Sequence, residues 1–592
     1  MSYKTLIGRF LIWRQEHLSD RYFIILLSAL IGFLAGIAAY SLKSAVFYIE
    51  DLLTAQFRIQ SQNYWYVVYP AIGIVLTVIL IRYIFRDRDT HGIPRILYVI
   101  SRLDGKMRFH KTFSSLLGSS LTAGFGGSIG LESPIISSGA SIGSTMAQFL
   151  RLNYRYTTLL IGCGAAGAIA SIFTTPIAAV IFSLEVLMLD LTTASIIPLL
   201  MASVTGAITT KLLLAEKMLV HFKVTEDFAI SDVPFFIVLG ILAGLLSLYF
   251  NRMHFAVANL ANRINNDWLR AAICGVSLGL LIFIFPTLYG EGYDSIQMIV
   301  SGNSEGLLNN SFFYSFRDQV WVFILLIVAI MLLKIVATTL TTEGGGIGGI
   351  FAPSAVTGGF MGFAFARIIN NLKLFAPLHE GNFTLVGMAG VLGGVLHAPL
   401  TAIFLIAEMT NGYELIVPLM LATAVSFFTI KTFDRHSIFT RQLAIRGDLI
   451  TRDKDQTVLT VLNIKNVIDK DVATIDKGLT LGDLTKVIAR SKRNMFPVVD
   501  ENKRFLGVVD MDDIRADMFD VSKYDTPIQH YIFQPLDHVS SHDSMKAVMD
   551  KFNATGYYNL PVIDDGIYVG FVSRAHVLNA YRQTLKYVSQ EE

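Results

Sequence analysis

The stretch Gly126-Gly-Ser-Ile-Gly-Leu-Glu-Ser-Pro134 decides the fold, because it places a carboxylate in a glycine-rich break between two apolar segments. An ionisable side chain at membrane depth is costly and therefore indicates a functional site. The glycines let the backbone bend and expose amides, and a helix that begins near Pro134 points its positive end toward Glu132. These features predict an anion site. The same residues are also compatible with Glu132 as a plain helix cap.

A second glycine-rich stretch repeats this pattern. Gly344-Gly-Gly-Ile-Gly-Gly-Ile-Phe-Ala-Pro353 also ends in a proline that opens an apolar segment. Aligning Pro134 with Pro353 places Glu132 opposite Phe351.

The repeat continues further along the chain with the same internal spacing, at Gly164…Pro176…Glu185 and Gly387…Pro399…Glu408. The pattern therefore predicts a duplicated membrane unit, and paired interrupted segments indicate a transport site between inverted repeats.

The composition excludes an ordinary soluble protein. Of 592 residues, 53% are hydrophobic and only 16% are charged, with a mean hydropathy of +0.53. The formal charge of +2 says nothing about nucleic acid, but no basic run with interleaved aromatic residues is present, so we expect no nucleic-acid partner. Cys163 and Cys274 lie in apolar segments, so we expect no disulfide framework and no metal site.

Hydropathy and basic residues predict the topology. Residues 1–20 have the pattern of an amphipathic helix on the inner membrane surface. Tyr22–Leu42 and Tyr64–Ile84 are long enough to span the bilayer, and Arg82 and Arg86 indicate that the second span ends in the cytoplasm. The polar segment 290–318 is expected outside. We predict a multi-pass inner-membrane protein with both termini in the cytoplasm.

Four motifs of this chain resemble those of the ClC family of chloride channels and chloride/proton antiporters. They are His91-Gly-Ile-Pro94, Gly130-Leu-Glu-Ser-Pro134, Gly349-Ile-Phe-Ala-Pro353 and Ala398-Pro-Leu-Thr…Glu408-Met-Thr. The resemblance covers residues 21–446 and implies an all-α polytopic fold with two inverted repeats, about 90–214 and 320–446, built from broken, tilted helices. It also implies a homodimer in membrane lipid, with a separate anion pathway in each subunit.

The resemblance assigns roles to individual residues. Glu132 would be the gating glutamate, which exchanges a proton with the outside and competes for an anion site. The anion-binding residues would be His91, Gly92, Ile93, Gly130, Leu131, Glu132, Gly349, Ile350, Phe351 and Phe439.

Three positions depart from the family pattern. His91 stands where the family has a central serine, Phe439 stands where it has a central tyrosine, and Val186 replaces an inner glutamate of well-coupled antiporters. Glu185 is expected to be structural, because Glu408 occupies the same place in the other repeat.

The function predicted from these features is voltage- or pH-gated transport of chloride or a similar monovalent anion by anion/proton antiport. A passive chloride channel is the alternative, since Val186 removes the inner carboxylate.

A CBS-regulated cation transporter is remote, because a cation pathway needs several carboxylates at membrane depth. The pattern G-x-S-x-G, which surrounds the catalytic serine of many hydrolases, occurs at Gly126–Gly130 and at Gly139–Gly143. A serine hydrolase is disfavoured, because that serine must follow a strand and neither of these sequences does. We expect no enzyme activity.

The tail, residues 447–592, has a soluble composition and its own repeat. Phe496-Pro-Val-Val-Asp500 followed by Leu506–Val509 recurs as Leu560-Pro-Val-Ile-Asp564 followed by Val569–Val572. This order of strands and helices resembles a tandem pair of CBS domains, about 458–520 and 525–586.

Such pairs often bind adenine nucleotides. The corresponding residues here are Asp510, Asp513, Ser573 and His576. A purely structural role is equally compatible with the sequence, and no cofactor is expected to be required.

Overall fold

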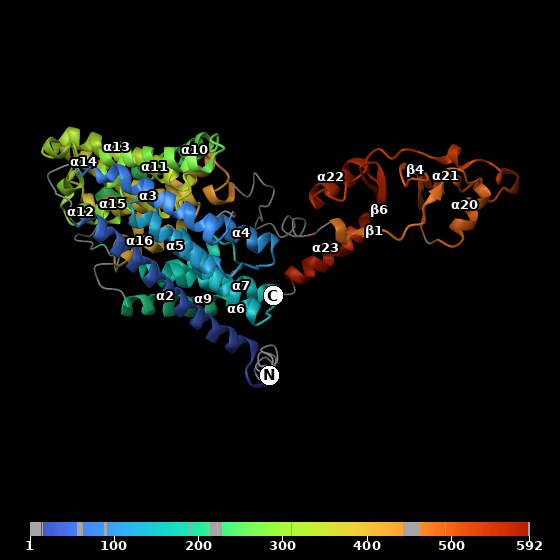
Figure 1. The fold of residues 1–592 in the computed structure, drawn as a ribbon, viewed down its shortest axis with the longest axis horizontal. Helices are drawn as coiled ribbons and strands as arrows, with labels where there is room; N and C mark the ends of the chain where they lie inside the picture. The colour runs from blue at the N-terminus through green and yellow to red at the C-terminus, as the bar shows by residue number, and fades with distance from the viewer. Residues whose placement is uncertain are drawn as a thin grey trace. The chain divides into compact units, whose positions relative to one another are not determined.

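The computed structural model describes residues 14, 16–55, 63–87, 92–189, 192–213, 222, 228–309, 311–441, 462, 464–491 and 493–589. It divides into two compact units, Met1–Gly447 and Asp448–Glu592. His91 and most of the helix predicted for residues 1–20 lie outside the described residues. Figure 1 shows that the N-terminal unit is built from packed helices, whereas the strands belong to the C-terminal unit.

Sixteen α-helices of the N-terminal unit are described. They are α2 (Asp20–Thr54), α3 (Trp65–Ile79), α4 (Ile93–Arg102), α5 (Lys111–Gly124), α6 (Glu132–Phe149), α7 (Tyr154–Phe173), α8 (Pro176–Glu185), α9 (Thr193–Leu213), α10 (Val233–Ala261), α11 (Asp267–Ile284), α12 (Tyr293–Val300), α13 (Val320–Glu343), α14 (Phe351–Leu372), α15 (Glu380–Leu396), α16 (Pro399–Met409) and α17 (Ile416–Phe433).

The helices differ widely in length, as expected for a fold of broken, tilted helices. Within the described residues, nine helices are long and apolar enough to cross a membrane. Helix α2 has 35 residues and is about 50 Å long, which exceeds the bilayer core and requires a tilt. Helix α8 has 10 residues and, at about 15 Å, covers only half of that core.

Glycine contacts show that the two repeats share one packing pattern. A methyl group on Gly139 would lie 2.2 Å from the carbonyl oxygen of Gly164, where α6 crosses α7. A methyl group on Gly358 would lie 2.3 Å from the carbonyl oxygen of Gly387, where α14 crosses α15. Small residues allow such close approach of helices in a membrane protein. The duplication predicted from the sequence is therefore present in the packing.

The C-terminal unit contains two small sheets and short helices. The strands are β1 (Ile468–Asp469), β2 (Ile475–Asp476), β3 (Met495–Val499), β4 (Phe505–Asp510), β5 (Asn559–Asp564) and β6 (Ile567–Ser573). The helices are α20 (Leu481–Ile488), α21 (Met511–Ile514), α22 (Met545–Thr555) and α23 (Arg574–Ser589). The strand orders are β2-β3-β4 and β1-β6-β5. The predicted hairpins correspond to β3–β4 and β5–β6.

The first strand of the C-terminal unit belongs to the sheet of the second repeat. Ile468 pairs with Val572 in an antiparallel register, although Ile468 lies at the start of the first repeat in the sequence. Ile464 and Val467 are also buried in the core of the second repeat, together with Leu560. The start of the first repeat in the sequence therefore packs into the core of the second repeat, while the rest of the first repeat forms a core of its own.

Candidate anion and proton site

The two glycine-rich breaks are joined directly. The N–H of Gly130 donates to the carbonyl of Gly349 at 2.9 Å, and the N–H of Gly349 donates to the carbonyl of Gly130 at 2.8 Å. Helices α6 and α14 begin at Glu132 and Phe351, two residues before the prolines that the sequence indicated as helix openers. A proline fits because the first turn of a helix needs no N–H donor. Glu132 therefore lies inside the first turn of α6.

A third helix begins at the same place. A methyl group on Gly92, which precedes α4, would lie 2.4 Å from Oγ of Ser133. A methyl group on Gly349 would lie 2.6 Å from Cβ of the same Ser133. The N-termini of α4, α6 and α14 therefore meet around Ser133. Three positive helix ends in one place favour an anion.

The side chain of Glu132 lies among these helix ends and is 1% exposed. Its Oε1 accepts a hydrogen bond of 2.8 Å from the hydroxyl of Tyr293. Its Oε2 is buried beside the N–H of Ala352 without forming a regular hydrogen bond. The carboxylate therefore spans from α6 to the N-terminus of α14, where an anion would be expected to bind.

The two backbone N–H groups predicted to bind the central anion, those of Ile350 and Phe351, are not used in the helix pairing. Among the described residues, none accepts a hydrogen bond from the N–H of Ile350 or Phe351. Gly130 and Gly349 were also predicted as anion-binding residues, and the N–H group of each donates to the carbonyl of the other. Pairing of the two breaks uses these two amides, whereas the N–H groups of the next two residues, Ile350 and Phe351, have no acceptor among the described residues.

The segment that follows α11 lies along the first break, which the sequence did not predict. Tyr289 packs on Gly126, where a methyl group would lie 2.0 Å from the ring. Glu291 accepts a hydrogen bond of 3.2 Å from the N–H of Leu131, and Tyr293 reaches Glu132. The polar segment 290–318 is therefore not simply an external loop. An acid flanked by two glycines, at Gly290 and Gly292, was the available signal, since it repeats the composition around Glu132.

Two buried lysines approach this region. The Nζ of Lys334 donates to the carbonyl oxygens of Gly290 at 2.9 Å and Leu288 at 3.3 Å, which ties the segment after α11 to α13. The Nζ of Lys43 on α2 donates to the carbonyl of Ile172 at 2.7 Å. Both ammonium groups interact electrostatically with Glu291. Buried charged groups are stable only beside groups of opposite charge, so Lys43, Lys334 and Glu291 form one charge cluster.

Aromatic rings form the other wall of the site. Phe351 stacks on Phe173 with centroids 5.9 Å apart and meets the edge of Phe182 at 6.4 Å. Phe173 in turn contacts the ring of Tyr293 at 5.9 Å. Val186, at the position of the inner glutamate, is 6% exposed at the end of α8. Phe351, Phe173 and Phe182 therefore form an aromatic wall beside Tyr293.

Glu185 and Glu408 cap each other's repeat. The carboxylate of Glu185 accepts hydrogen bonds from the N–H groups of Leu400 and Thr401, at 3.3 and 2.8 Å, at the start of α16. The carboxylate of Glu408 accepts from Ile177 and Ala178, at 3.1 and 2.8 Å, at the start of α8. The structural role expected for Glu185 agrees with this geometry, because its oxygens satisfy helix amides.

Two predicted anion residues, His91 and Phe439, are not assigned to this cluster. His91 lies outside the described residues. Phe439 is 7% exposed in a helical turn where Ser437 and Thr440 are 3.1 Å apart at their hydroxyls. Within the described part of the chain, no contact joins Phe439 to Glu132 or Phe351. Gly92 and Ile93 lie at the start of α4, next to Ser133.

The predicted nucleotide residues act within their own repeats. Asp510 accepts a hydrogen bond of 3.0 Å from the N–H of Asp512 and caps α21. Ser573 accepts one of 3.1 Å from the N–H of His576 at the start of α23. Asp513 and His576 are exposed. Asp510 and Ser573 therefore make capping contacts. No described contact joins the two residues predicted in the first repeat to the two predicted in the second.

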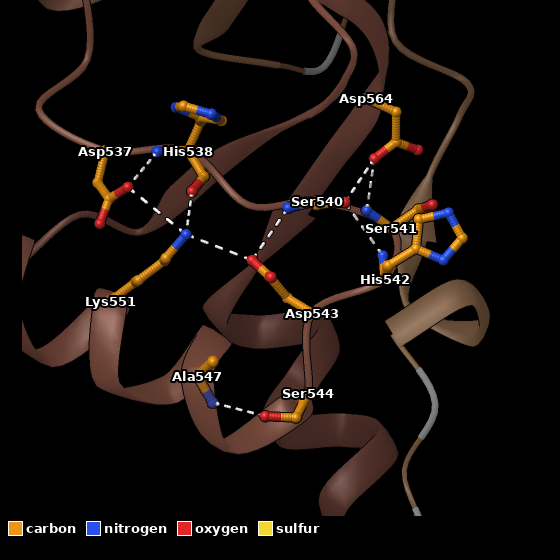
Figure 2. Close-up of polar contacts among 10 residues, drawn as sticks. All are labelled: Asp537, His538, Ser540, Ser541, His542, Asp543, Ser544, Ala547, Lys551 and Asp564. Atoms are coloured by element: carbon orange, nitrogen blue, oxygen red, sulfur yellow. Dashed lines mark hydrogen bonds and ion pairs between the residues drawn. The ribbon is translucent and has the colours of Figure 1, made fainter. Parts of the chain in front are cut away.

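The loop before α22 is held by a denser polar network (Figure 2). Asp564 accepts hydrogen bonds from Oγ of Ser540 at 2.7 Å and from N–H of Ser541 at 2.9 Å. These donors lower the pKa of Asp564 to about 2. Lys551 donates to the carbonyl of His538 and to Asp543 at 2.5 and 3.3 Å. The network fixes the loop to Asp564 at the end of β5.

Known families match both units. The sequence model of the voltage gated chloride channel family matches residues 72–431. The CBS domain model matches residues 464–520 and 528–583. The H⁺/Cl⁻ exchange transporter ClcA from Klebsiella pneumoniae is 25% identical over 417 residues, which cover 67% of this chain and 83% of that protein.

Two solved structures share the fold of the N-terminal unit. A slow cyanobacterial Cl⁻/H⁺ antiporter has a TM-score of 0.62 at 22% identity and covers 72% of this chain and 98% of its own. A CLC-type fluoride/proton antiporter has a TM-score of 0.57 at 24% identity and covers 70% of this chain and 96% of its own.

Proposed function

This chain belongs to the voltage gated chloride channel family, and we propose that it exchanges chloride or a similar monovalent anion for protons across a membrane. The observation that supports this most directly is the carboxylate of Glu132, buried where three helix N-termini meet. The protein is a membrane transporter with no expected enzyme activity.

The geometry explains how one residue can be both gate and proton acceptor. When charged, the carboxylate of Glu132 is itself an anion, so it occupies the space between α6 and α14. When a proton binds, the neutral acid no longer matches the positive helix ends and gives way to a transported anion. The N–H groups of Ile350 and Phe351 then bind that anion. His91 and Phe439 offer no family-type hydroxyl there, so backbone amides carry the selectivity.

A passive channel is the second candidate, and the specific observation in its favour is Val186. This residue is buried where the family pattern has a second acid, and the neighbouring wall is aromatic. A cation transporter has less support, because the lysines Lys43 and Lys334 share this region with the carboxylates.

Anion and proton movement in liposomes tests the proposal. Purified protein in vesicles loaded with chloride should release chloride and take up protons, and an outward chloride gradient should drive protons against an imposed pH gradient. Chloride release without any proton movement would support the channel. Passage of potassium or magnesium with exclusion of chloride would contradict both anion functions.

Assembly and orientation belong to the same proposal. We expect a homodimer in the inner membrane, with both termini and the tail in the cytoplasm and lipid around the helices. Ile177 and Leu400, at the starts of α8 and α16, are exposed apolar residues on adjacent helices and suit a partner subunit. Cross-linking of single cysteines at these positions in vesicles tests the dimer.

We further propose that the tail binds an adenine nucleotide, with no cofactor required for transport itself. The hydrogen-bonded loop before α22 and the adjacent end of β5 supply a rigid wall for such a ligand. Calorimetry with ATP, ADP and AMP tests this idea. If none of the three nucleotides gives a heat of binding, the two CBS domains have a purely structural role.

A further inference from the structure

Glu291 is a second carboxylate at the gate. Its Oε1 accepts the N–H of Leu131, the residue immediately before Glu132, at 3.2 Å. The family resemblance predicted this N–H as an anion ligand. A carboxylate therefore already occupies one of the amides that a transported anion would need.

Neighbouring elements place Glu291 on the external side of Glu132. Arg82, near the cytoplasmic end predicted for the second span, forms an ion pair with Asp267 at the start of α11. Helix α11 therefore begins at the cytoplasmic face and ends at the opposite face with Ile284. Glu291 follows this external end and contacts α6 from outside.

The charges around Glu291 come from four elements. Glu132 faces it from α6, Lys43 and Glu50 from α2, Tyr293 and Asp294 from α12, and Lys334 from α13. Lys43 and Lys334, when charged, offset part of the negative charge of these carboxylates. An entering anion adds one negative charge, and one proton on Glu132 or Glu291 removes it again.

We propose that Glu291 is a second, external gating carboxylate. In its charged form it holds the N–H of Leu131 and closes the outer mouth of the anion pathway. A proton from outside neutralises it, weakens its hydrogen bond to Leu131 and frees that amide for the anion. When the proton returns to the outside, the carboxylate closes the mouth again. This inference rests on the proposed anion transport.

A merely structural Glu291 would behave differently. In that case its oxygen would only fasten the segment after α11 to the start of α6. Glu291→Gln keeps the size and a carbonyl acceptor for Leu131 but removes the charge and the titration. A structural role would therefore survive the substitution, whereas a gate would lose its response to pH.

The test is the rate of chloride flux in vesicles at fixed internal pH, with external pH varied from about 4.5 to about 8. Wild-type flux should rise as external pH falls. Glu291→Gln should raise flux at neutral external pH by about tenfold, because a charged acceptor is replaced by a weaker neutral one, and should make the pH curve shallower, because Glu132 alone still titrates. Glu305→Gln, an exposed acid in the same segment, is the matched control and should follow wild type.

Glu291→Asp is the second variant. It retains a titratable carboxylate that reaches Leu131 less well, so its flux at neutral pH should rise while the pH response persists. If wild type moves chloride and protons but Glu291→Gln keeps the wild-type pH curve, this inference is overturned alone. If wild type moves no chloride, the proposed function fails and the inference fails with it.

Discussion

The carboxylate of Glu132 is held by a hydroxyl and by helix ends, and these partners determine how readily it leaves. Tyr293 supplies the only regular side-chain hydrogen bond among the described contacts of Glu132, at 2.8 Å. The N-terminus of α14 supplies positive potential at the other oxygen. Both partners favour the charged form in the pathway, so each of them sets the threshold at which an external proton opens the gate.

Tyr293→Phe should loosen this gate. The substitution removes the hydroxyl and keeps the ring against Phe173, so the charged carboxylate loses one donor without a loss of packing. A hydrogen bond to a charged group contributes roughly 1.5–3 kcal/mol, so chloride flux at neutral external pH should rise about tenfold or more. Vesicle flux measures this effect. A variant that is as slow as wild type would show that Tyr293 does not restrain Glu132.

Asp564 carries a separate, pH-dependent stability contribution in the C-terminal unit. Its pKa of about 2 in the folded protein is below the usual aspartate value of about 3.9, so its stabilising effect is complete above the usual value and disappears as pH falls toward 2. Asp564→Asn should therefore lower the stability of β5 at pH 7 and have little effect near pH 2. Hydrogen exchange of the Ile563 N–H, which donates to the carbonyl of Val539, measures the stability of β5. An equal loss at both pH values would exclude this role.

At the scale of elements, the repeats determine which helices stop inside the membrane. Helices α6 and α14 begin at their aligned residues Glu132 and Phe351, and the breaks before them pair through Gly130 and Gly349. Spacing of glycine and proline was enough to predict these two starts. Spacing did not indicate that the pairing would use both glycine amides, because that depends on how the two halves meet.

The exchanged caps at α8 and α16 give a matched pair of predictions. Glu185→Ala and Glu408→Ala should each lower the free energy of unfolding by about 1 kcal/mol, because each leaves two helix amides without an acceptor. Anion selectivity should stay as in wild type. Thermal unfolding in detergent measures the stability, and vesicle flux measures the selectivity. A change in selectivity with Glu185→Ala alone would assign that residue to the pathway instead of to a cap.

At the scale of the whole molecule, the sequence predicted two units but not the contacts of the segment after α11 with the start of α6. Both repeats in the sequence, that of the membrane helices and that of the tail hairpins, correspond to repeated structure. Glu291 and Tyr293 were missed because their partners are 160 and 161 residues away in the chain. Periodicity reports which face of a segment is buried, but it does not report which distant segment covers it.

Removing the tail tests whether the membrane unit alone determines selectivity. Deletion of the residues after about 455 should change the amount of dimer or the rate of flux, because the tail is a compact unit of its own. The order in which anions pass should stay unchanged, since the helix ends around Glu132 all belong to the first unit. Competition between chloride and other anions in vesicle flux measures this order. An altered order would place part of the selectivity site in the tail.

The most direct test of the central claim is chloride and proton flux in Glu132→Gln at two external pH values, compared with wild type. Glutamine keeps the size of the side chain but neither carries the charge nor binds the proton. We expect coupled proton movement to be absent in the variant, and the pH dependence of its chloride flux to fall to the part that Glu291 contributes. If Glu132 were only a cap of α6, the variant would lose about 1 kcal/mol of stability and keep the pH response of wild type. A retained pH response with retained proton movement would contradict the account.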